Sequence, residues 1–493
     1  MGTETLWITT RLAVWPTAIT YNSGGLRRWV GLPKRIDSRI PVQTSCEVNQ
    51  PVADRVTGFP SARRAACRLQ GDGGTVRECG ISAGQRRRHE VSANRGSMTS
   101  RERIAAAMRH QPMDCVPLSL DMHPSYRSGP LASARNQFDV IDVLTAKGTD
   151  PTVDIWFPVQ APHPDVKVSY WREPDPDGKG ILRCKVYETP AGPLRQVVWE
   201  TADWESADHM LFSRTTCGER SARTPDLEML DDYNAPRAKE VLIKDEADLH
   251  RMEYLFQPLS GPALEKWREE ALYAKSEAQR RNLFLHARRT FAGSAMLWLC
   301  RPEDFMCRMV DKPAYVECFL RIIQDWQNWA LSVVLDIGVD MVSRFGLYDG
   351  PSYWGTKYFA RHLAPLIEEE TRIVHQGGAL HAHGQSEGLT AYRELFKGMS
   401  VDVLMGADEV QGGDDFEILA RELGKQKAFW GGINSDVTLA SGSEEQLEQA
   451  VLRALRTLGT NSGLVLWPVW SVYHQISWAQ VEALVRVWQR YRS

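Results

Sequence analysis

The regular alternation of short apolar runs with helix-like segments restricts the fold of this sequence more than any other feature. Helical periodicity marks five of the intervening segments: Pro313–Ile337, Trp354–His375, Phe416–Gly424, Glu444–Leu458 and Ser477–Tyr491. Eight strand-like runs follow Met98: Val116–Asp121, Val153–Phe157, Asn282–His286, Asp340–Phe345, Gly378–His383, Val401–Met405, Lys427–Gly431 and Leu464–Val469. Eight such repeats are typical of a parallel barrel, so we predict an α/β fold of the (β/α)8 TIM-barrel class.

One segment interrupts this rhythm. Residues 165–202 alternate polar and apolar side chains around two turn sequences, Pro174–Gly178 and Pro190–Pro193. This pattern predicts an antiparallel hairpin inserted between early barrel units. Long insertions often cover an active site. The polar stretch 214–245 is expected to be a loop.

Residues 1–97 differ from the rest of the chain in composition. They carry 15 basic and seven acidic residues and lack a sustained apolar period. An Arg-rich arm for nucleic acid and a transit peptide are two interpretations. The third, which we favour, is a disordered or spurious N-terminal extension, because Thr99 and Glu102 form a capping box directly after Met98. The barrel domain is then 98–493.

Residues 98–493 carry 44 basic and 55 acidic residues, and this negative balance argues against a nucleic-acid partner. No apolar run approaches the roughly 18 residues of a membrane span. The nine cysteines show no CxxC pair or regular spacing, so a disulfide framework is not expected. We predict a cytoplasmic protein.

Residues capable of chemistry follow the predicted strands, at the edge where barrel enzymes place their active sites. They are Asp121, His123, His286, Arg288, Tyr348, Asp349, His381, His383, Asp408, Asn434, Trp470 and His474. His381 and His383 are two positions apart in a strand, so both point to one side of the pleat and form half of a metal site. Substrate contact and a structural role are the alternatives for this pair.

The other positions also have two interpretations each. Asp121 and His123 either bind substrate or serve turn chemistry. His286 with Arg288 forms either an anion clamp or a solvated loop. Asp408 is either an acid/base group or an ordinary solvated carboxylate.

Several segments resemble the uroporphyrinogen decarboxylase superfamily when taken in order. They are Met98–Met108, Asp114–Leu118, Tyr187–Pro193, Phe291–Ser294, Asp349–Pro351 and Phe429–Asn434. The resemblance covers nearly all of 98–493 and none of 1–97. It implies a TIM barrel, in agreement with the strand count.

The resemblance to the decarboxylase branch implies a cofactor-independent reaction in which arginines hold substrate carboxylates. The two signature arginine positions fall here on Met122 and Tyr126, with Arg127 one residue away, and Trp470 stands at the late catalytic histidine. This branch therefore implies a decarboxylase of a tetrapyrrole or other carboxylated substrate, with Asp121, His123 and Tyr348 in place of the arginines.

The cobamide-dependent methyltransferase branch implies zinc on a His-x-Cys pair and a later cysteine. His381 matches the histidine, His383 replaces the first cysteine, and His474 is the candidate third ligand. Catalytic roles then go to Asp121, His123, Tyr348 and Asp349, and substrate binding to His286, Arg288, Asp408 and Trp470.

Our leading expectation is a metal-assisted methyltransferase that acts with a corrinoid or a small methylated compound. A corrinoid protein and a second copy of the chain are the expected partners. The alternatives are the decarboxylase above and an inactive ligand-binding barrel.

Overall fold

A computed structural model of the chain describes residues 98–123, 126, 128–158, 160–200, 237–289, 293–461 and 463–492. The predictions for residues 1–97 and for Arg127 lie outside this range. Among the described helices, none has the length and apolar character needed to cross a bilayer.

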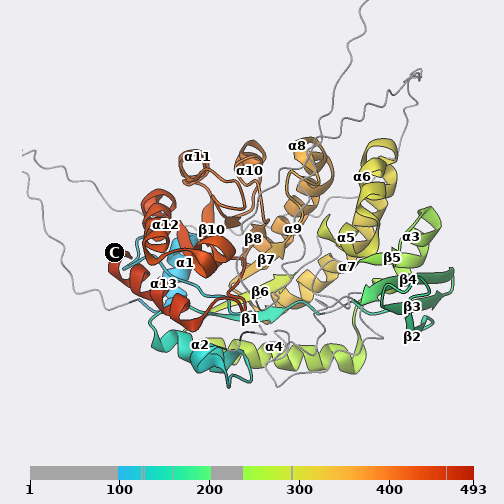
Figure 1. The fold of residues 1–493 in the computed structure, drawn as a ribbon, viewed down its shortest axis with the longest axis horizontal. Coiled ribbons are helices and arrows are strands. Elements are labelled where there is room, and N and C mark those ends of the chain that lie inside the picture. The colour runs from blue at the N-terminus through green and yellow to red at the C-terminus, as the bar shows by residue number, and fades with distance from the viewer. Residues whose placement is uncertain are drawn as a thin grey trace, which may run out of the picture. The chain divides into compact units, whose positions relative to one another are not determined.

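Seven parallel strands form the central sheet, in the order β1-β6-β7-β8-β9-β10-β11 (Figure 1). Their bounds are β1 Thr152–Trp156, β6 Phe284–Arg289, β7 Met341–Phe345, β8 Leu380–Gly384, β9 Val403–Ala407, β10 Ala428–Asn434 and β11 Leu464–Val469. Seven of the eight predicted runs are therefore strands, and the α/β class with a parallel sheet is confirmed.

The first predicted run, Val116–Asp121, does not form a continuous strand. It contributes two isolated parallel bridges, from Leu118 to Leu466 and from Met122 to Val472. Pro117 accepts a hydrogen bond from the Leu466 amide but has no amide hydrogen of its own to donate. This is one reason why the segment follows β11 without completing a ladder.

Helices lie between successive strands and cover the outside of the sheet (Figure 1). Those of seven residues or more are α1 Ser100–Met108, α2 Gln137–Ala146, α3 Glu246–Met252, α4 Gly261–Arg281, α6 Pro302–Asp311, α7 Pro313–Ile337, α9 Ala364–Gln376, α11 Phe416–Glu422, α12 Glu444–Thr457 and α13 Trp478–Tyr491. The capping box of Thr99 and Glu102 is present at the start of α1. The prediction for α7 is confirmed at both ends.

The predicted helix Trp354–His375 is divided into three parts. A short α8, Gly355–Tyr358, leads through a π-helical turn, Phe359–Leu363, into α9. Pro365 lies at the start of α9, where its missing amide and its ring prevent the regular hydrogen-bond pattern of the preceding turn.

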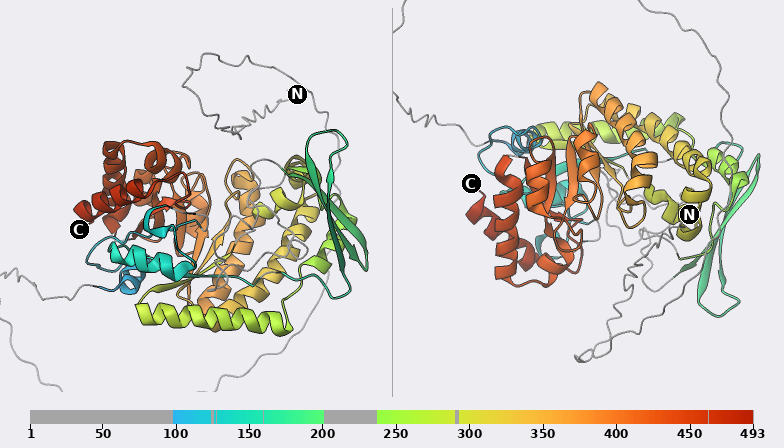
Figure 2. Two further views of the ribbon diagram at one scale, coloured as in Figure 1. Left: turned by 60° about the horizontal axis from the view of Figure 1, so that its bottom comes forward. Right: turned by 90° about the horizontal axis from the view of Figure 1, so that it is seen from above.

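The inserted sheet is antiparallel, in the order β2-β3-β4-β5, and confirms the hairpin predicted for 165–202. Its strands are β2 Lys167–Pro174, β3 Ile181–Thr189, β4 Gly192–Glu200 and β5 Ala238–Glu240. We expected the stretch 214–245 to be a loop, but β5 lies within it. This short strand forms because its backbone pairs with that of β4 at Val197 and Val198. Figure 2 shows this sheet at the opposite end of the body from the C-terminal helices.

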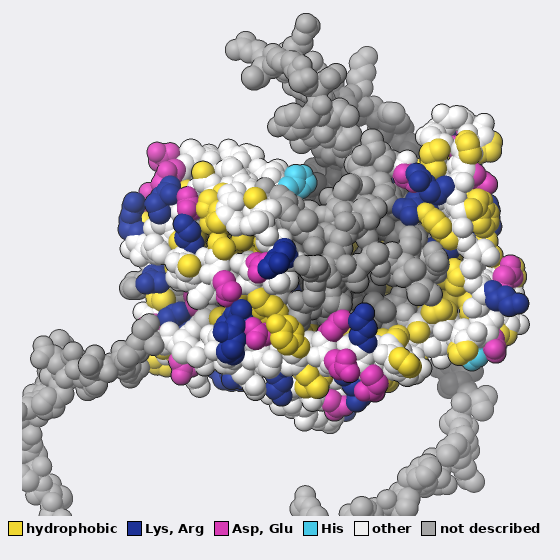
Figure 3. All heavy atoms as spheres, turned by 90° about the horizontal axis from the view of Figure 1, so that it is seen from below, with side chains coloured by type: hydrophobic (Ala, Val, Ile, Leu, Met, Phe, Trp, Pro, Cys, Tyr) yellow, Lys and Arg dark blue, Asp and Glu magenta, His cyan; other side chains and the backbone are white. Residues whose placement is uncertain are grey.

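Basic and acidic side chains are interspersed on the described part of the face seen from below (Figure 3). A surface of this kind carries little net field of either sign.

The strands of the central sheet are buried on both faces. One face packs against α4, α7 and other helices through residues such as Val342 and Leu285. The other face encloses an interior filled by large side chains, among them Phe345, Trp430 and Trp467. Successive residues of a strand point to opposite faces of the sheet. The known positions of the residues just named therefore tell us, for each strand that contains one of them, which side chains face the interior and which face the helices.

Candidate functional site

A polar cluster occupies the interior face of β1 and β6. Arg288 lies two residues after His286 on β6, and Asp154 lies opposite on β1. The Arg288 guanidinium donates through Nη1 to Asp121 Oδ2 at 2.7 Å, and its Nε pairs with Asp154 Oδ2 at 2.9 Å. Ser471 also donates to Asp121 Oδ2, at 3.0 Å. We call Asp121, Asp154, His286 and Arg288 the interior cluster.

His286 is completely buried in the interior cluster. Its Nε2 shares a hydrogen bond with Ser343 of β7 at 2.8 Å, and its Nδ1 is 3.6 Å from Asp154. Burial, and then the charge of Arg288, hold the pKa of His286 well below its usual value. Counted formally, a neutral His286, two carboxylates and one guanidinium give the interior cluster one net negative charge.

Aromatic rings lie beside the interior cluster. The Phe345 ring centroid is 5.6 Å from the Arg288 guanidinium and 5.7 Å from the centroid of Trp470. Trp470 lies across the ends of β8 and β9, where a Cβ on Gly384 or Gly406 would come within 3.0 Å of its ring. Glycine at these two positions therefore lets the Trp470 ring sit directly on the strand ends.

His123 is buried beside the loop that follows β11. Its ring stacks on Tyr473 with 4.8 Å between centroids, and its amide donates to Val472. Met122 and Tyr126, at the two positions where the decarboxylase branch has arginines, are both buried in the apolar core.

His381 and His383 point away from the interior, toward the helices. Ala382 between them packs in the interior, so the two histidines share the opposite face. His381 Nδ1 is 2.7 Å from the Thr371 hydroxyl of α9. Because that hydroxyl donates to the Ile367 carbonyl, Nδ1 carries the imidazole proton.

Aromatic rings and an amide surround the second histidine of the pair. The His383 ring lies about equally far from Phe359 and Phe396, with centroids 6.1 Å and 5.9 Å away. Its Nε2 lies 3.2 Å from the Gln385 side-chain oxygen. Both histidines thus pack in the layer between β8 and its helices.

The three predicted zinc ligands do not come together. His474 is exposed on the loop after β11, whereas His381 and His383 are buried behind β8. Zinc needs three or four donor atoms converging at about 2.0–2.3 Å. Within the described residues no group of three His, Cys, Asp or Glu side chains is placed to hold a metal. The side chains present do not fit zinc.

Asp349 is buried in a second charged group behind β7, together with Arg344 and Glu370. Arg344 donates to Glu370 Oε1 at 2.7 Å and to Asp349 Oδ2 at 3.5 Å. Burial raises the pKa of Asp349. A Cβ on Gly293 or Gly346 would collide with its carboxylate, so both glycines leave room for it. We call these three charged residues the Arg344 cluster.

Tyr348 follows β7 and Asp408 follows β9, and β8 lies between these two strands. The Tyr348 amide donates to the Ser294 hydroxyl, and the Tyr348 ring lies 5.9 Å from that of Trp298. Asp408 shapes the loop after β9, where its carboxylate accepts from the Val410 amide and from Asn434. This is the turn chemistry that was the alternative for Asp408.

Comparison with known families concerns the C-terminal part of the chain. The model of the uroporphyrinogen decarboxylase (URO-D) family matches residues 293–491. The resemblance to the URO-D superfamily is therefore confirmed over this part of the chain. The match runs from the segment before α6 to α13, whereas the interior cluster draws Asp121, Asp154, His286 and Arg288 from residues before the match.

One solved structure agrees with the fold. A methyltransferase from Methanosarcina mazei has a TM-score of 0.50 and 12% identity, over 80% of this chain and 99% of its own. A B12-independent methionine synthase from a Shewanella species has a TM-score of 0.35 and 10% identity, over 52% of this chain and 70% of its own. A search of curated proteins finds no match. At these identities the likeness to the first structure concerns the fold alone.

The sequence did not predict Asp154 and Ser343 as residues of the site. Both lie inside strands rather than after them. A signal was present for Asp154, since it stands between the apolar residues Val153 and Ile155. A polar residue at an alternate position of a buried strand indicates the inner face of the barrel.

Acid should destabilise this protein through His286. The unfolded chain takes up a proton on this histidine near pH 6.5, the usual value, while the folded chain does so only at lower pH. The unfolded state therefore binds more protons below that pH, and the free energy of unfolding falls as the pH drops.

We expect His286→Gln to flatten this dependence. Urea unfolding of both proteins at pH 7.5 and 5.5 measures it. The stability difference between wild type and variant should shrink toward pH 5.5, and a constant difference would contradict the assigned neutral imidazole.

Proposed function

We propose that the chain is a methyltransferase-type enzyme that takes a small methylated cation at the interior cluster, without zinc. The observation that carries the proposal is the formal negative charge of the interior cluster, together with the Phe345 ring beside Arg288 and the Trp470 ring beside Phe345. Quaternary ammonium and sulfonium groups are attracted both by carboxylates and by aromatic faces. Residues 117–122 act in this proposal as the eighth strand of a closed barrel.

Asp121 is the acid/base group of the proposed reaction. It is 9% exposed and Arg288 is 3% exposed, so the carboxylate is the more accessible partner of the ion pair. Its Oδ2 atom accepts hydrogen bonds from Arg288 and from Ser471. The methyl group passes from the nitrogen or sulfur of the donor to a thiol sulfur, and the thiol proton passes to Asp121.

Arg288 and Asp154 position this carboxylate rather than react. Arg288 holds Asp121 by its guanidinium fork, and Asp154 holds Arg288 from the other side. The cobalt of a corrinoid, free or on a partner protein, is the alternative methyl acceptor in this proposal, and then no thiol proton moves.

A carboxylated substrate fits this site less well. It would meet the net negative charge of the interior cluster, and Arg288 is already paired with two carboxylates. Like charges in a partly dry site repel strongly. The decarboxylase therefore receives less support from the geometry than methyl transfer.

Labelled donors test the proposal. Full-length chain is incubated with 13C-methyl tetramethylammonium or trimethylsulfonium and a thiol, and NMR follows transfer of the label to sulfur. Transfer that continues in the presence of a chelator supports the proposal. Transfer that is lost with chelator and restored by zinc would contradict the metal-free site, and carbon dioxide release from an added acid would favour the decarboxylase.

A further inference from the structure

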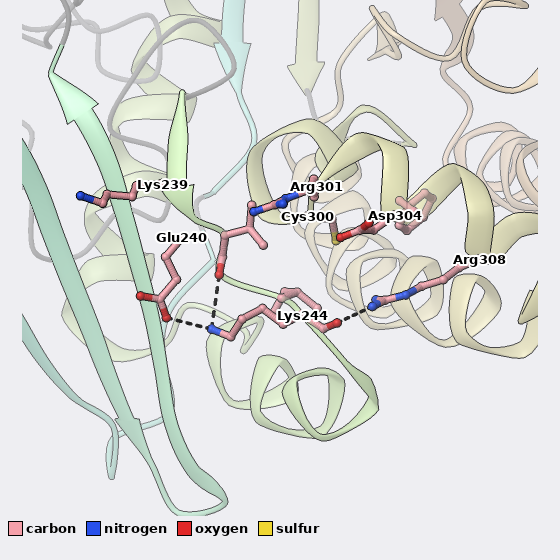
Figure 4. Close-up of a pocket in the computed structure, with 10 residues that line it drawn as sticks. Lys239, Glu240, Lys244, Cys300, Arg301, Asp304 and Arg308 are labelled. Atoms are coloured by element: carbon pink, nitrogen blue, oxygen red, sulfur yellow. Dashed lines mark hydrogen bonds and ion pairs between the residues drawn. The ribbon is translucent and has the colours of Figure 1, made fainter. Parts of the chain in front are cut away.

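A cavity of about 290 Å³ is lined by residues that do not belong to the interior cluster (Figure 4). β5, the stretch from Val241 to Lys244 and the first turns of α6 line it. We propose that this cavity binds a small organic molecule through a phosphate group.

The wall of the cavity has an excess of positive charge. Four of the lining side chains are basic, namely Lys239, Lys244, Arg301 and Arg308, and two are acidic, namely Glu240 and Asp304. The lining therefore has a formal excess of two positive charges, which matches the charge of a phosphate dianion.

The basic groups are held in place before a ligand arrives. Arg308 donates to the Lys244 carbonyl and lies 4.4 Å from the centre of the Tyr315 ring. The Lys244 ammonium donates to Glu240 at 3.2 Å and to the Val241 carbonyl at 3.4 Å. Figure 4 shows Lys244 between Glu240 on one side and Arg308 on the other. A fixed group loses less conformational entropy when it binds a ligand.

Arg301 is the cation left for the ligand. It is exposed at the start of α6, and no ion pair joins it to another described residue. The planar guanidinium matches the oxygens of a phosphate in two parallel hydrogen bonds.

The remainder of the lining is apolar. Val241, Ile243 and Phe305 are buried and face the same cavity as the cations. An inorganic phosphate ion has no apolar group to pack against this surface, whereas the organic part of a phosphate ester does. Apolar walls with a few fixed polar groups are typical of small-molecule sites.

Calorimetric titration of the full-length chain with phenyl phosphate and with inorganic phosphate tests this inference at constant ionic strength. We expect both to bind, phenyl phosphate more tightly. Arg301→Gln should weaken both at least tenfold, and Arg456→Gln, which changes an exposed arginine of α12, should not. Because Arg301 is exposed, the variant should fold, and its unfolding temperature without ligand verifies this.

Three results would overturn the inference. They are equal binding to wild type and Arg301→Gln, no binding of phenyl phosphate, and equal affinity for the two phosphates, which would leave the apolar lining without a role. Methyl transfer at the interior cluster should be unchanged in Arg301→Gln, so failure of this inference and failure of the proposed function are separate results.

Discussion

Replacing Arg344 with methionine is expected to lower the free energy of unfolding by about 3–5 kcal/mol. Arg344 is 1% exposed, and the carboxylates of Glu370 and Asp349 that it binds are fully buried. Methionine keeps much of the volume but leaves both acids without their cation. The folded chain can then avoid a buried, unpaired negative charge only by protonating these carboxylates, and protonation of a carboxylate at pH 7 costs free energy. Urea unfolding at pH 7 measures the loss.

Two further variants separate charge from packing. Arg361→Met removes an exposed arginine that pairs with Glu317, and it should change stability by less than about 1 kcal/mol. The double variant Arg344→Met with Glu370→Gln should recover part of the lost free energy of unfolding, because it also removes the buried negative charge of Glu370. A single-variant loss as small as that of Arg361→Met would show that the Arg344 cluster is hydrated in solution.

The strands could be predicted from sequence because buried parallel strands are short apolar runs with clear boundaries. β11 is confirmed residue for residue, and other strands begin within about two residues of their predicted starts. Val116–Asp121 is the exception. Its apolar residues are typical of a strand. An apolar run does not show, however, whether each backbone N–H and C=O group will have a hydrogen-bond partner on the adjacent strand.

The sequence could not predict which face of the sheet the side chains of His381 and His383 lie on, and the reason is physical. The period of two places His381 and His383 on one face, but β8 is buried on both faces, so its sequence does not reveal which face is inner. The interior holds the large rings of Trp430, Trp467 and Trp470, and a Cβ at Gly384 of β8 would come within 3.0 Å of the Trp470 ring. Ala382 and Gly384 therefore face inward, and the histidines face the helices.

Three of the four residues of the interior cluster, Asp121, His286 and Arg288, were predicted as site residues from their places near strand ends. For His286 with Arg288, an anion clamp and a solvated loop were the two interpretations. In the structure the anions that Arg288 binds are Asp121 and Asp154 of the chain itself. Sequence spacing cannot reveal such pairing, because β1 and β6 are adjacent in the sheet but about 130 residues apart in the chain.

Asp121→Asn is expected to reduce methyl transfer by a factor of about 10²–10⁴. The amide keeps the shape and can still accept from Arg288 and Ser471, but it neither takes the thiol proton nor carries charge. The interior cluster then becomes neutral, since Arg288 is balanced by Asp154 alone among the members of the cluster. Binding of tetramethylammonium, measured by calorimetry, should weaken along with the rate.

Two companion variants distinguish the reacting group from a merely structural one. Ser471→Ala removes one hydrogen bond to Asp121 and keeps its charge, so binding of the cation should stay close to that of wild type. Asp165→Asn removes an exposed carboxylate outside the site and should change neither quantity. If Asp121→Asn bound tetramethylammonium as tightly as Ser471→Ala does, the negative charge of the interior cluster would not be what selects the ligand, and the proposed substrate class would be wrong.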